Sequence, residues 1–482
     1  MPQHELDAFF YPKSVAIVGA SENLTSFGRY YMDHILSYGY KGKIYPVNPK
    51  APQILGVKAY PDLEQIPDTI DFVISLIALG NAPDLLTKCS KKGVKAVHVM
   101  AGRGSETGRP EAKKIEDDIL KMAKEYGIRV LGPNCLGVFC PKTGLSFGYD
   151  FPKEPGTVGA MIQSGGNSTD LIRFSALRGI KFSKIISYGN ALDINQNDAL
   201  EYLAQDQDTK IILCYIEGLK GSPKKFYDLL KNTTKSKPVA ICKAGRTEAG
   251  VRQALSHTAS LAGSGKIWEI AIRQAGAVPV RDLDELVNQG VAFYYLPAIK
   301  GKRVGLGGGG GGRSVLSADV WEENGFVVSP LPQEIREDWK RKGSPLWDWI
   351  SNPADKSIFT QGEQFNLSEA LIDMSKHPNF DFIVGTVTED VPFIKEQVIN
   401  EITDDVEGFI KTKKGSDKPF LVIYTDRPLG IKQIDDWRWR LFAETRTRLM
   451  DEQVAIFTNI DQAAKAVREL IFYYQKREQK TK

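Results

Sequence analysis

Cysteine is scarce in this sequence of 482 residues, and the net charge of the chain is small. The five cysteines are scattered and none forms a Cys-x-x-Cys pair. This argues against a disulfide framework or a metal site in this chain and favours free thiols in a reducing cytoplasm. Lys and Arg number 63 against 59 Asp and Glu. With no basic excess, we expect neither a nucleic acid nor a membrane as partner.

Long hydrophobic runs are also missing. The longest apolar runs, such as residues 72–79, have the size of a strand. They fall far short of the roughly 20 residues that a membrane-spanning helix needs. The first ten residues lack a basic region followed by an apolar one, so we expect no export signal and a cytoplasmic protein.

Short β-branched apolar runs alternate with amphipathic helical stretches along the chain. Such runs are typical of parallel strands covered by helices on both faces. A Pro- and Gly-rich segment at 141–155 and a basic one at 298–302 divide the series. The sequence therefore predicts an α/β fold of three consecutive doubly wound domains, at residues 1–140, 151–297 and 302–478. Ligands of such sheets bind at the carboxyl ends of the strands, so the turns there are the candidate sites.

The first strand is followed by Gly19, Ala20 and Ser21, and then by a helix. A glycine turn before a helix places backbone N–H groups and the positive end of the helix dipole against a phosphate. A dinucleotide site would require Gly-x-Gly-x-x-Gly and an acidic residue after the second strand. Lys50 stands there instead, which suits a phosphorylated ribose such as that of coenzyme A. The alternative is an ordinary turn whose glycine only permits tight packing.

Two more strand–turn–helix junctions are rich in glycine. One contains Gly165, Gly166 and Asn167, and the other is the six-glycine run 307–312, followed by Arg313. Glycine at a helix start permits close approach of an anion to the backbone. For the six-glycine run, the alternative is a flexible low-complexity loop.

His257 lies between these two junctions in a loop of small residues. Two phosphate-competent helix starts in one chain favour a phosphoryl-accepting imidazole there, because phosphoryl transfer requires mainly positioning and charge stabilisation. A carboxylate would orient the second ring nitrogen, and Glu217 at the end of a strand is the candidate. The alternatives are a surface histidine and an exposed glutamate at a strand end.

Seven motifs, in order along almost the whole chain, resemble those of the nucleoside-diphosphate-forming acyl-CoA synthetases, the superfamily that includes succinyl-CoA synthetase. Specifically, the chain looks like the α subunit of an ADP-forming acetyl-CoA synthetase. The motifs are SVAIVGAS (14–21), YPVNPK (45–50), LGPNCLGV (131–138), QSGGNS (163–168), YIEG (215–218), SHTASLAGS (256–264) and SNPAD (351–355).

The resemblance implies a Rossmann-like CoA-binding domain followed by two flavodoxin-like domains of the succinyl-CoA-synthetase type. It implies that His257 is transiently phosphorylated and that Glu217 is its hydrogen-bond partner. It assigns phosphate binding to Gly165, Gly166 and Asn167 together with Gly310, Gly311 and Gly312. It assigns CoA binding to Gly19, Ala20, Ser21, Lys50, Met100, Ala101, Gly102 and Asn134.

The implied reaction interconverts acyl-CoA, phosphate and ADP with a carboxylic acid, CoA and ATP. We recognise no ATP-grasp region in the sequence, so the resemblance implies a separate β subunit that binds ADP and Mg²⁺, in an α2β2 assembly. Two other functions stay open at this point. One is a catalytically silent CoA-binding protein with a regulatory or scaffolding role, and the other is a nicotinamide-dependent dehydrogenase.

Overall fold

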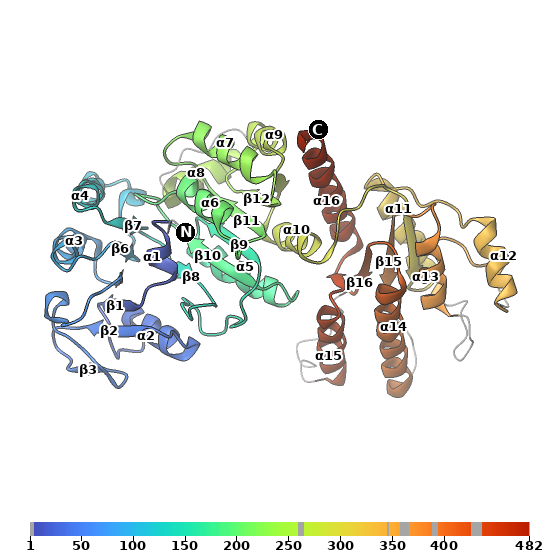
Figure 1. Cartoon of the computed structure of the whole chain (residues 1–482), viewed down its shortest axis with the longest axis horizontal. Coiled ribbons are helices and arrows are strands. Elements are labelled where there is room, and N and C mark those ends of the chain that lie inside the picture. Colours follow the sequence, from blue (N-terminus) through green and yellow to red (C-terminus); the bar gives the residue numbers. More distant parts are fainter. Residues whose placement is uncertain are drawn as a thin grey trace. The chain divides into compact units, whose positions relative to one another are not determined.

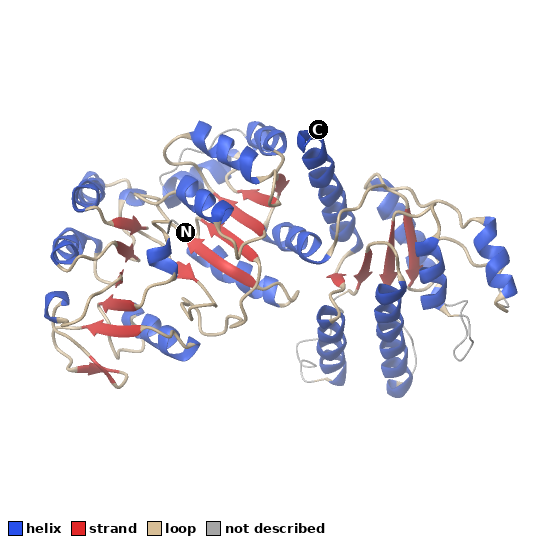
Figure 2. Ribbon diagram, viewed as in Figure 1, coloured by secondary structure: helices blue, strands red, loops and turns tan. Residues whose placement is uncertain are grey.

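The computed structural model describes residues 4–258, 265–344, 347–356, 366–387, 394–425 and 436–481, with the backbone alone at 254–258 and 480–481. The chain divides into two compact units, Met1–Leu286 and Val287–Lys482. The first unit contains two large sheets and the second contains one (Figure 1). Helices surround each sheet, as Figure 2 shows in blue.

The first sheet is fully parallel, with strand order β2-β1-β5-β6-β7. All five residues of β1 are buried, because the strand lies in the middle of the sheet and is covered on both faces. Around this sheet the chain forms β1 (Ser14–Val18), β2 (Lys43–Val47), β5 (Phe72–Ser75), β6 (Ala96–Val99), β7 (Arg129–Leu131), the hairpin β3 (Gln53–Ile54) and β4 (Val57–Lys58), the helices α1 (Asp7–Phe10), α2 (Phe27–Tyr38), α3 (Ala82–Lys91) and α4 (Pro110–Tyr126), and the 3-10 turns η1 (Leu63–Gln65), η2 (Leu79–Asn81) and η3 (Ser105–Thr107).

The second sheet has the order β13-β12-β11-β9-β10-β8 and is parallel except at one edge. There β8 pairs antiparallel with β10, although β8 directly follows the first sheet in sequence. The elements are β8 (Gly137–Phe139), β9 (Val158–Ile162), β10 (Phe182–Ser187), β11 (Ile211–Ile216), β12 (Val239–Lys243) and β13 (Val278–Val280), with α5 (Gly165–Ala176), α6 (Gln196–Gln205), α7 (Pro223–Thr233), α8 (Glu248–Thr258), α9 (Gly265–Ala275) and α10 (Leu283–Tyr295).

The third sheet, in the second unit, is parallel with the order β14-β15-β16-β17. Helix α11 packs against α16, whereas α13, α14 and α15 pack against one another in sequence order. The elements are β14 (Val304–Gly308), β15 (Phe382–Thr386), β16 (Phe420–Ile423) and β17 (Ala455–Phe457), with α11 (Gly311–Glu323), α12 (Gln333–Arg341), α13 (Leu367–Lys376), α14 (Lys395–Gly415), α15 (Trp437–Asp451) and α16 (Ile460–Thr481). The prediction of an α/β fold with parallel-sheet domains is confirmed.

In each of the three sheets, the next two segments that join the sheet after one strand pair with opposite sides of that strand. The second strand pairs on one side of β1 and the next large strand, β5, on the other side. The same reversal occurs around β9, between β10 and β11. At β14, residue Ala354 forms a parallel bridge on the side opposite β15. Such reversals open a crevice at the carboxyl ends of the strands, which is where the predicted glycine turns lie.

The turn 351–355 is fixed to β14 by the side chain of Asn352, which is 9% exposed. Its Oδ1 accepts a hydrogen bond from the backbone N–H of Leu306 at 2.8 Å. Its Nδ2 donates to the carbonyl oxygens of Val304 and Ser329, each at 2.9 Å. One amide therefore satisfies three main-chain groups and holds this turn along the edge of the third sheet.

We expect Asn352→Ala to lower the free energy of unfolding of the second unit by about 2–4 kcal/mol, because it leaves buried main-chain groups without partners. Chemical denaturation of the full chain, followed by tryptophan fluorescence, measures this. The exposed Asn379 provides the control, since Asn379→Ala should leave the transition unchanged. Equal midpoints for the two variants would contradict the structural role of Asn352.

Candidate functional site

The turn after β1 is in direct contact with the start of α2. Gly19 has φ +94°, in the left-handed region that favours glycine. Ser26 caps α2 by accepting a hydrogen bond from the N–H of Arg29 at 3.1 Å. A Cβ on Gly28 would lie 2.1 Å from the carbonyl oxygen of Gly19 and 2.9 Å from the nitrogen of Ser21. Only glycine at position 28 lets the helix terminus approach the turn this closely.

The turns after β1 and β2 are joined by Asn48. Its Nδ2 donates to the carbonyl oxygen of Ala20 at 2.8 Å, and its Oδ1 accepts from the N–H groups of Lys50 and Ala51 at 2.8 and 3.1 Å. Lys50 is exposed beside this junction. Sequence reasoning singled out Lys50 but missed Asn48. The signal for it was the side-chain type, because asparagine often bonds to main-chain groups near it in sequence.

A cavity of about 230 Å³ lies at the carboxyl ends of β1, β2 and β5. The apolar part of its wall includes Val18, Val47 and Ile77. The charged part includes Asp62, Asp84 and Lys88. Lys88 pairs with Asp62 at 2.7 Å and with Asp84 at 3.2 Å. Apolar walls with a few polar groups suit a heteroaromatic base. The apolar part of this lining therefore fits the base of a nucleotide, while two carboxylates against one ammonium give the cavity no excess of positive charge for phosphates.

The loop after β6 and the turn after β7 meet at Asn134. The N–H of Asn134 donates to the carbonyl oxygen of Ala101 at 3.1 Å, and a Cβ on Gly102 would lie 3.0 Å from the Asn134 Oδ1. Met100 follows β6 and donates its N–H to Ser75. The structure thus brings together Asn134 and the loop 100–102, as the sequence analysis expects of residues that share a ligand.

Sequence reasoning missed the residues that hold this loop from the other side. Asn190, which follows β10 in the second sheet, donates through Nδ2 to Glu106 at 2.7 Å and to Glu116 at 3.1 Å. Glu116 is 5% exposed and also accepts from the N–H of Ser105 at 3.0 Å. The Asn134 Nδ2 lies 3.3 Å from the Asn190 Oδ1. The contacts of Asn190 join residues more than 50 positions apart, so no local sequence pattern predicts them.

The turn after β9 leads into α5 with an open first turn. Ser164 caps the helix by accepting from the N–H of Asn167 at 3.4 Å. A Cβ on Gly165 would lie 3.0 Å from the Leu136 side chain, whereas one on Gly166 would meet nothing within 4 Å. The N-terminus of α5 can therefore receive an anion at Gly166, where backbone N–H groups and the helix dipole favour negative charge.

The reversal around β9 places this turn next to Glu217, which is 5% exposed. Gln163, at the end of β9, accepts through Oε1 from the N–H groups of Glu217 and Gly218 at 2.8 and 3.1 Å. The Asn167 side chain bonds to the Tyr215 hydroxyl, and that hydroxyl donates to Glu217 Oε1 at 3.4 Å. Burial raises the pKa of Tyr215, so its hydroxyl stays protonated and available as a donor. The structure thus connects Asn167 to Glu217.

His257 falls on α8, so the expectation that it lies in a loop is wrong for its backbone. The reason is local: residues 248–255 include good helix formers, and Glu248 stands in the first turn. The His257 side chain and the whole of 259–264 lie outside the described residues. Helix α8 lies against η3, which contains Glu106 and follows the loop 100–102 in sequence. The helix of the candidate nucleophile and the loop of the candidate CoA site are therefore neighbours.

The six-glycine run is divided between three kinds of structure. Gly307 and Gly308 end β14, Gly310 precedes α11, and Gly311 and Gly312 form its first turn. Gly308 has φ +94°, and a Cβ there would lie 2.1 Å from the Thr386 carbonyl oxygen. A Cβ on Gly310 or Gly312 would meet nothing within 4 Å, so the helix start is open on that side.

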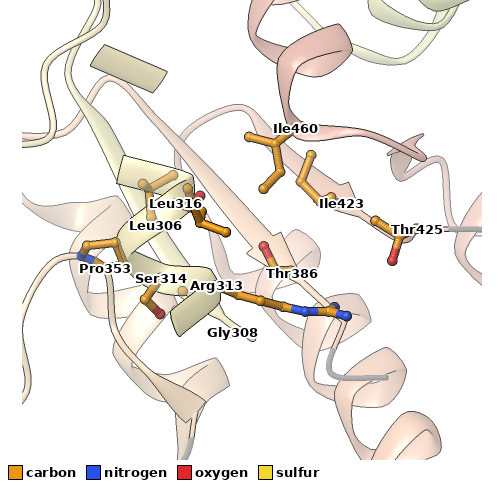
Figure 3. A pocket seen from close by; sticks show the side chains of 12 residues that line it. Leu306, Gly308, Arg313, Ser314, Leu316, Pro353, Thr386, Ile423, Thr425 and Ile460 are labelled. Carbon is orange, nitrogen blue, oxygen red and sulfur yellow. The ribbon is translucent and has the colours of Figure 1, made fainter. Parts of the chain in front are cut away.

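A second cavity, of about 130 Å³, lies at the carboxyl ends of β14, β15 and β16. Its walls include Leu316, Ile423 and Ile460. Figure 3 shows the Arg313 side chain running from the start of α11 along this cavity, near Thr386. The start of α11 therefore combines open backbone with a guanidinium group, which suits an anion.

Two families match parts of the chain. Residues 13–141 match the family described as "CoA binding domain", and residues 155–293 match "Succinyl-CoA ligase like flavodoxin domain". The match to the first family agrees with the glycine turn, Asn48 and the cavity at the ends of β1, β2 and β5. Together, the two matches give a CoA-binding domain followed by a domain of the CoA-ligase type.

The chain is 34% identical to "Acetate--CoA ligase [ADP-forming] II subunit alpha" of Pyrococcus furiosus, over 87% of this chain and 90% of that protein. It is 38% identical to "Acetate--CoA ligase [ADP-forming]" of Methanocaldococcus jannaschii, over 73% of this chain but only 49% of that protein. A solved acetyl-coenzyme A synthetase 1 of Ca. Korarchaeum cryptofilum, in complex with phosphate and ADP, superposes with a TM-score of 0.81 at 29% identity, covering 99% of this chain and 98% of that one.

The chain therefore belongs to the family of ADP-forming acyl-CoA synthetases, and it corresponds to their α subunit. This confirms the resemblance drawn from the seven motifs. It also favours the ligase over the silent CoA-binding protein. Among the described residues, no helix is long and apolar enough to cross a membrane.

Proposed function

We propose that this chain, together with a separate ATP-grasp β subunit, interconverts acyl-CoA, phosphate and ADP with a carboxylic acid, CoA and ATP in three steps. Phosphate attacks the thioester carbonyl, giving an acyl phosphate and releasing CoA as the thiol. The imidazole of His257 then attacks the phosphorus, and the carboxylate leaves. Finally the phosphohistidine transfers its phosphoryl group to the terminal oxygen of ADP, which gives ATP and restores His257.

The observation that carries the proposal is the cluster formed by Gln163, Asn167, Tyr215 and Glu217 at the reversal around β9. A buried carboxylate beside an open helix N-terminus can orient an imidazole and sit close to the phosphoryl group that the imidazole accepts. Glu217 accepts from the Tyr215 hydroxyl, which fixes one of its oxygens. We assign Glu217 the role of hydrogen-bond partner of His257.

The other site residues keep the roles that the resemblance gives them, as proposals. The N-termini of α5, at Gly165, Gly166 and Asn167, and of α11, at Gly310 to Gly312, would bind the phosphate. Coenzyme A would extend from Lys50 and the turn 19–21 to the loop 100–102 and Asn134. The contact of that loop with Asn134 supports the last part of this path. The domain boundaries at 1–140, 151–297 and 302–478 belong to the same proposal.

The β subunit is proposed because relatives of this length are named as α subunits. The chain spans most of those relatives but about half of the relative from Methanocaldococcus jannaschii, whose name mentions no subunit. We propose that the rest of such a relative corresponds to the partner that binds ADP and Mg²⁺. We further propose an α2β2 assembly in the cytoplasm, where the five cysteines, all free and buried, would stay reduced.

The test combines the chain with its candidate β subunit, Mg²⁺ and ATP labelled in the γ-phosphate. We expect an acid-labile, base-stable label on the chain, followed by release of labelled phosphate and formation of acetyl-CoA when acetate and CoA are added. A chain that binds CoA but takes up no label would overturn the proposal and favour the silent CoA-binding protein.

A further inference from the structure

Lys243 is a buried lysine to which the three steps above give no role. It ends β12 and is 3% exposed. Its ammonium donates to the carbonyl oxygen of Glu217 at 2.8 Å and to that of Ala244. The same ammonium lies 5.2 Å from the ring centroid of Trp268, where a cation–π attraction adds to the hydrogen bonds. A lysine this deeply buried is rare unless it is paired with something specific.

Lys243 and Gln163 hold the Glu217 residue from both ends. The Gln163 Oε1 accepts from the Glu217 N–H at 2.8 Å, and Lys243 donates to the Glu217 carbonyl oxygen. Gln163 directly follows β9, Glu217 follows β11 and Lys243 ends β12, so the ends of three neighbouring strands contribute. Because both main-chain groups of Glu217 are hydrogen-bonded, its Cα is held in place. The side chain that carries the carboxylate therefore extends from a fixed position.

The contact with Trp268 extends this hold to α9, the helix that follows His257 in sequence. The start of α9 is close to the chain just after Lys243, because a Cβ on Gly265 would lie 3.1 Å from the Arg246 Cβ. Lys243 thus touches both the strand end that carries Glu217 and the helix at one end of the His257 segment.

We infer that Lys243 is a positioning residue. Its ammonium links the carbonyl group of Glu217 to Trp268 in the first turn of α9, and so holds the Glu217 carboxylate in position for His257. The inference rests on the proposed function. It assigns Lys243 no contact with substrate and no proton transfer. Its consequence is a slower phosphorylation of His257 when the ammonium is removed, with CoA binding unchanged.

The pH dependence of the labelling rate distinguishes a positioning role of Lys243 from a merely structural one, because the strength of its hydrogen bonds follows the protonation of its ammonium. Burial lowers the pKa of Lys243 to about 8, and the Glu217 carboxylate partly opposes this. Arg246 lowers the pKa further, the Cys242 thiol raises it, and Trp268 on α9 does not titrate. Lys243 is therefore mostly charged at pH 7 and mostly neutral above pH 9. Since charge-assisted hydrogen bonds are roughly twice as strong as neutral ones, the hold on Glu217 weakens over this range.

Lys237 provides a matched control in the same sheet. It precedes β12, at the opposite end of that strand from Lys243, and donates to the carbonyl oxygens of Leu203 and Asp206 at 2.8 and 2.6 Å. Burial lowers its pKa to about 8 as well. Lys237→Met removes a half-buried ammonium whose pKa is lowered to a similar value and which also donates to two carbonyl oxygens, without touching Glu217.

The experiment measures the initial rate of labelling by γ-labelled ATP, with the β subunit present, from pH 6.5 to 9.5. We expect Lys243→Met to slow labelling at pH 7 about 10–100-fold, the range typical for residues that orient a functional group. Lys237→Met should keep the wild-type rate and the wild-type decline above pH 8. In Lys243→Met that decline should be absent. CoA affinity and thermal midpoint are measured alongside.

Labelling of Lys243→Met at the rate of Lys237→Met would overturn the inference. If Lys243→Met does not fold, the pH profiles of the wild type and of Lys237→Met provide the test. Equal labelling rates at pH 7 and pH 9.5 would show that protonation of Lys243 does not affect labelling, and would overturn the inference. A wild-type chain that takes up no label at any pH would instead reject the proposed function, and the positioning role with it.

Discussion

A chain with His257→Ala should take up no phosphoryl label from ATP, at least about a 10³-fold loss, because the nucleophile itself is gone. Overall synthesis of acyl-CoA should fall with it. The dissociation constant for CoA should stay within a factor of two, since the residues that we propose for CoA binding lie around the first sheet. The measurements are acid-labile labelling with the β subunit present, the coupled acyl-CoA assay and calorimetric titration of CoA.

The control for this variant is His377→Ala, which removes a histidine of the second unit whose Nδ1 accepts only from the nearby N–H of Asn379 among the bonds described. It should be labelled like the wild type. Label that persists in His257→Ala would show another acceptor, and the assignment of His257 would then be wrong. Loss of label in both variants would indicate a general loss of structure.

Gly28→Ala should greatly weaken CoA binding and destabilise the first unit. The new Cβ would overlap the Gly19 carbonyl oxygen at 2.1 Å and crowd the Ser21 nitrogen at 2.9 Å. Both are main-chain atoms that cannot rotate away, so either α2 or the turn must shift. Overpacking of this kind costs about 1–3 kcal/mol and sometimes more. We expect at least a 10-fold higher dissociation constant for CoA and a lower midpoint of thermal unfolding.

Gly80→Ala is the matched control, because Gly80 also belongs to the first unit and a Cβ there would meet nothing within 4 Å. It should bind CoA like the wild type and unfold at the same temperature. If Gly28→Ala behaves in the same way, the close approach of α2 to the turn is not needed for binding. Binding lost with the thermal midpoint unchanged would place the effect in the ligand site alone.

The sequence was most informative where burial leaves a continuous pattern. Residues 14–18 and 211–216 are apolar on both faces, so their place in parallel sheets could be predicted. The turns that follow them carry Gly19 and Glu217, which the structure places at chain reversals. In contrast, β8 has only three residues and pairs with a strand that is distant in sequence, so its pairing with β10 could not be foreseen.

The candidate site was predictable in its glycines and its charged residues, but its supporting contacts were not. Asn190, Glu116 and Lys243 act through partners 26 to 84 positions away. Nothing in their immediate neighbours distinguishes them from surface residues of the same type. His257 was singled out from the sequence, but its backbone was predicted wrongly, because local helix propensity extends α8 through its position while the surrounding small residues suggested a loop.

The antiparallel pairing of β8 with β10 has a consequence for any attempt to divide the chain. Strand β8 covers the outer edge of β10, so its removal would expose unpaired N–H and C=O groups along a buried, β-branched strand. Such open edges recruit other chains and lead to aggregation. A fragment that starts after residue 150 would therefore be prone to self-association, and one that stops at residue 140 would carry a strand without a partner. The first and second sheets should therefore be expressed together.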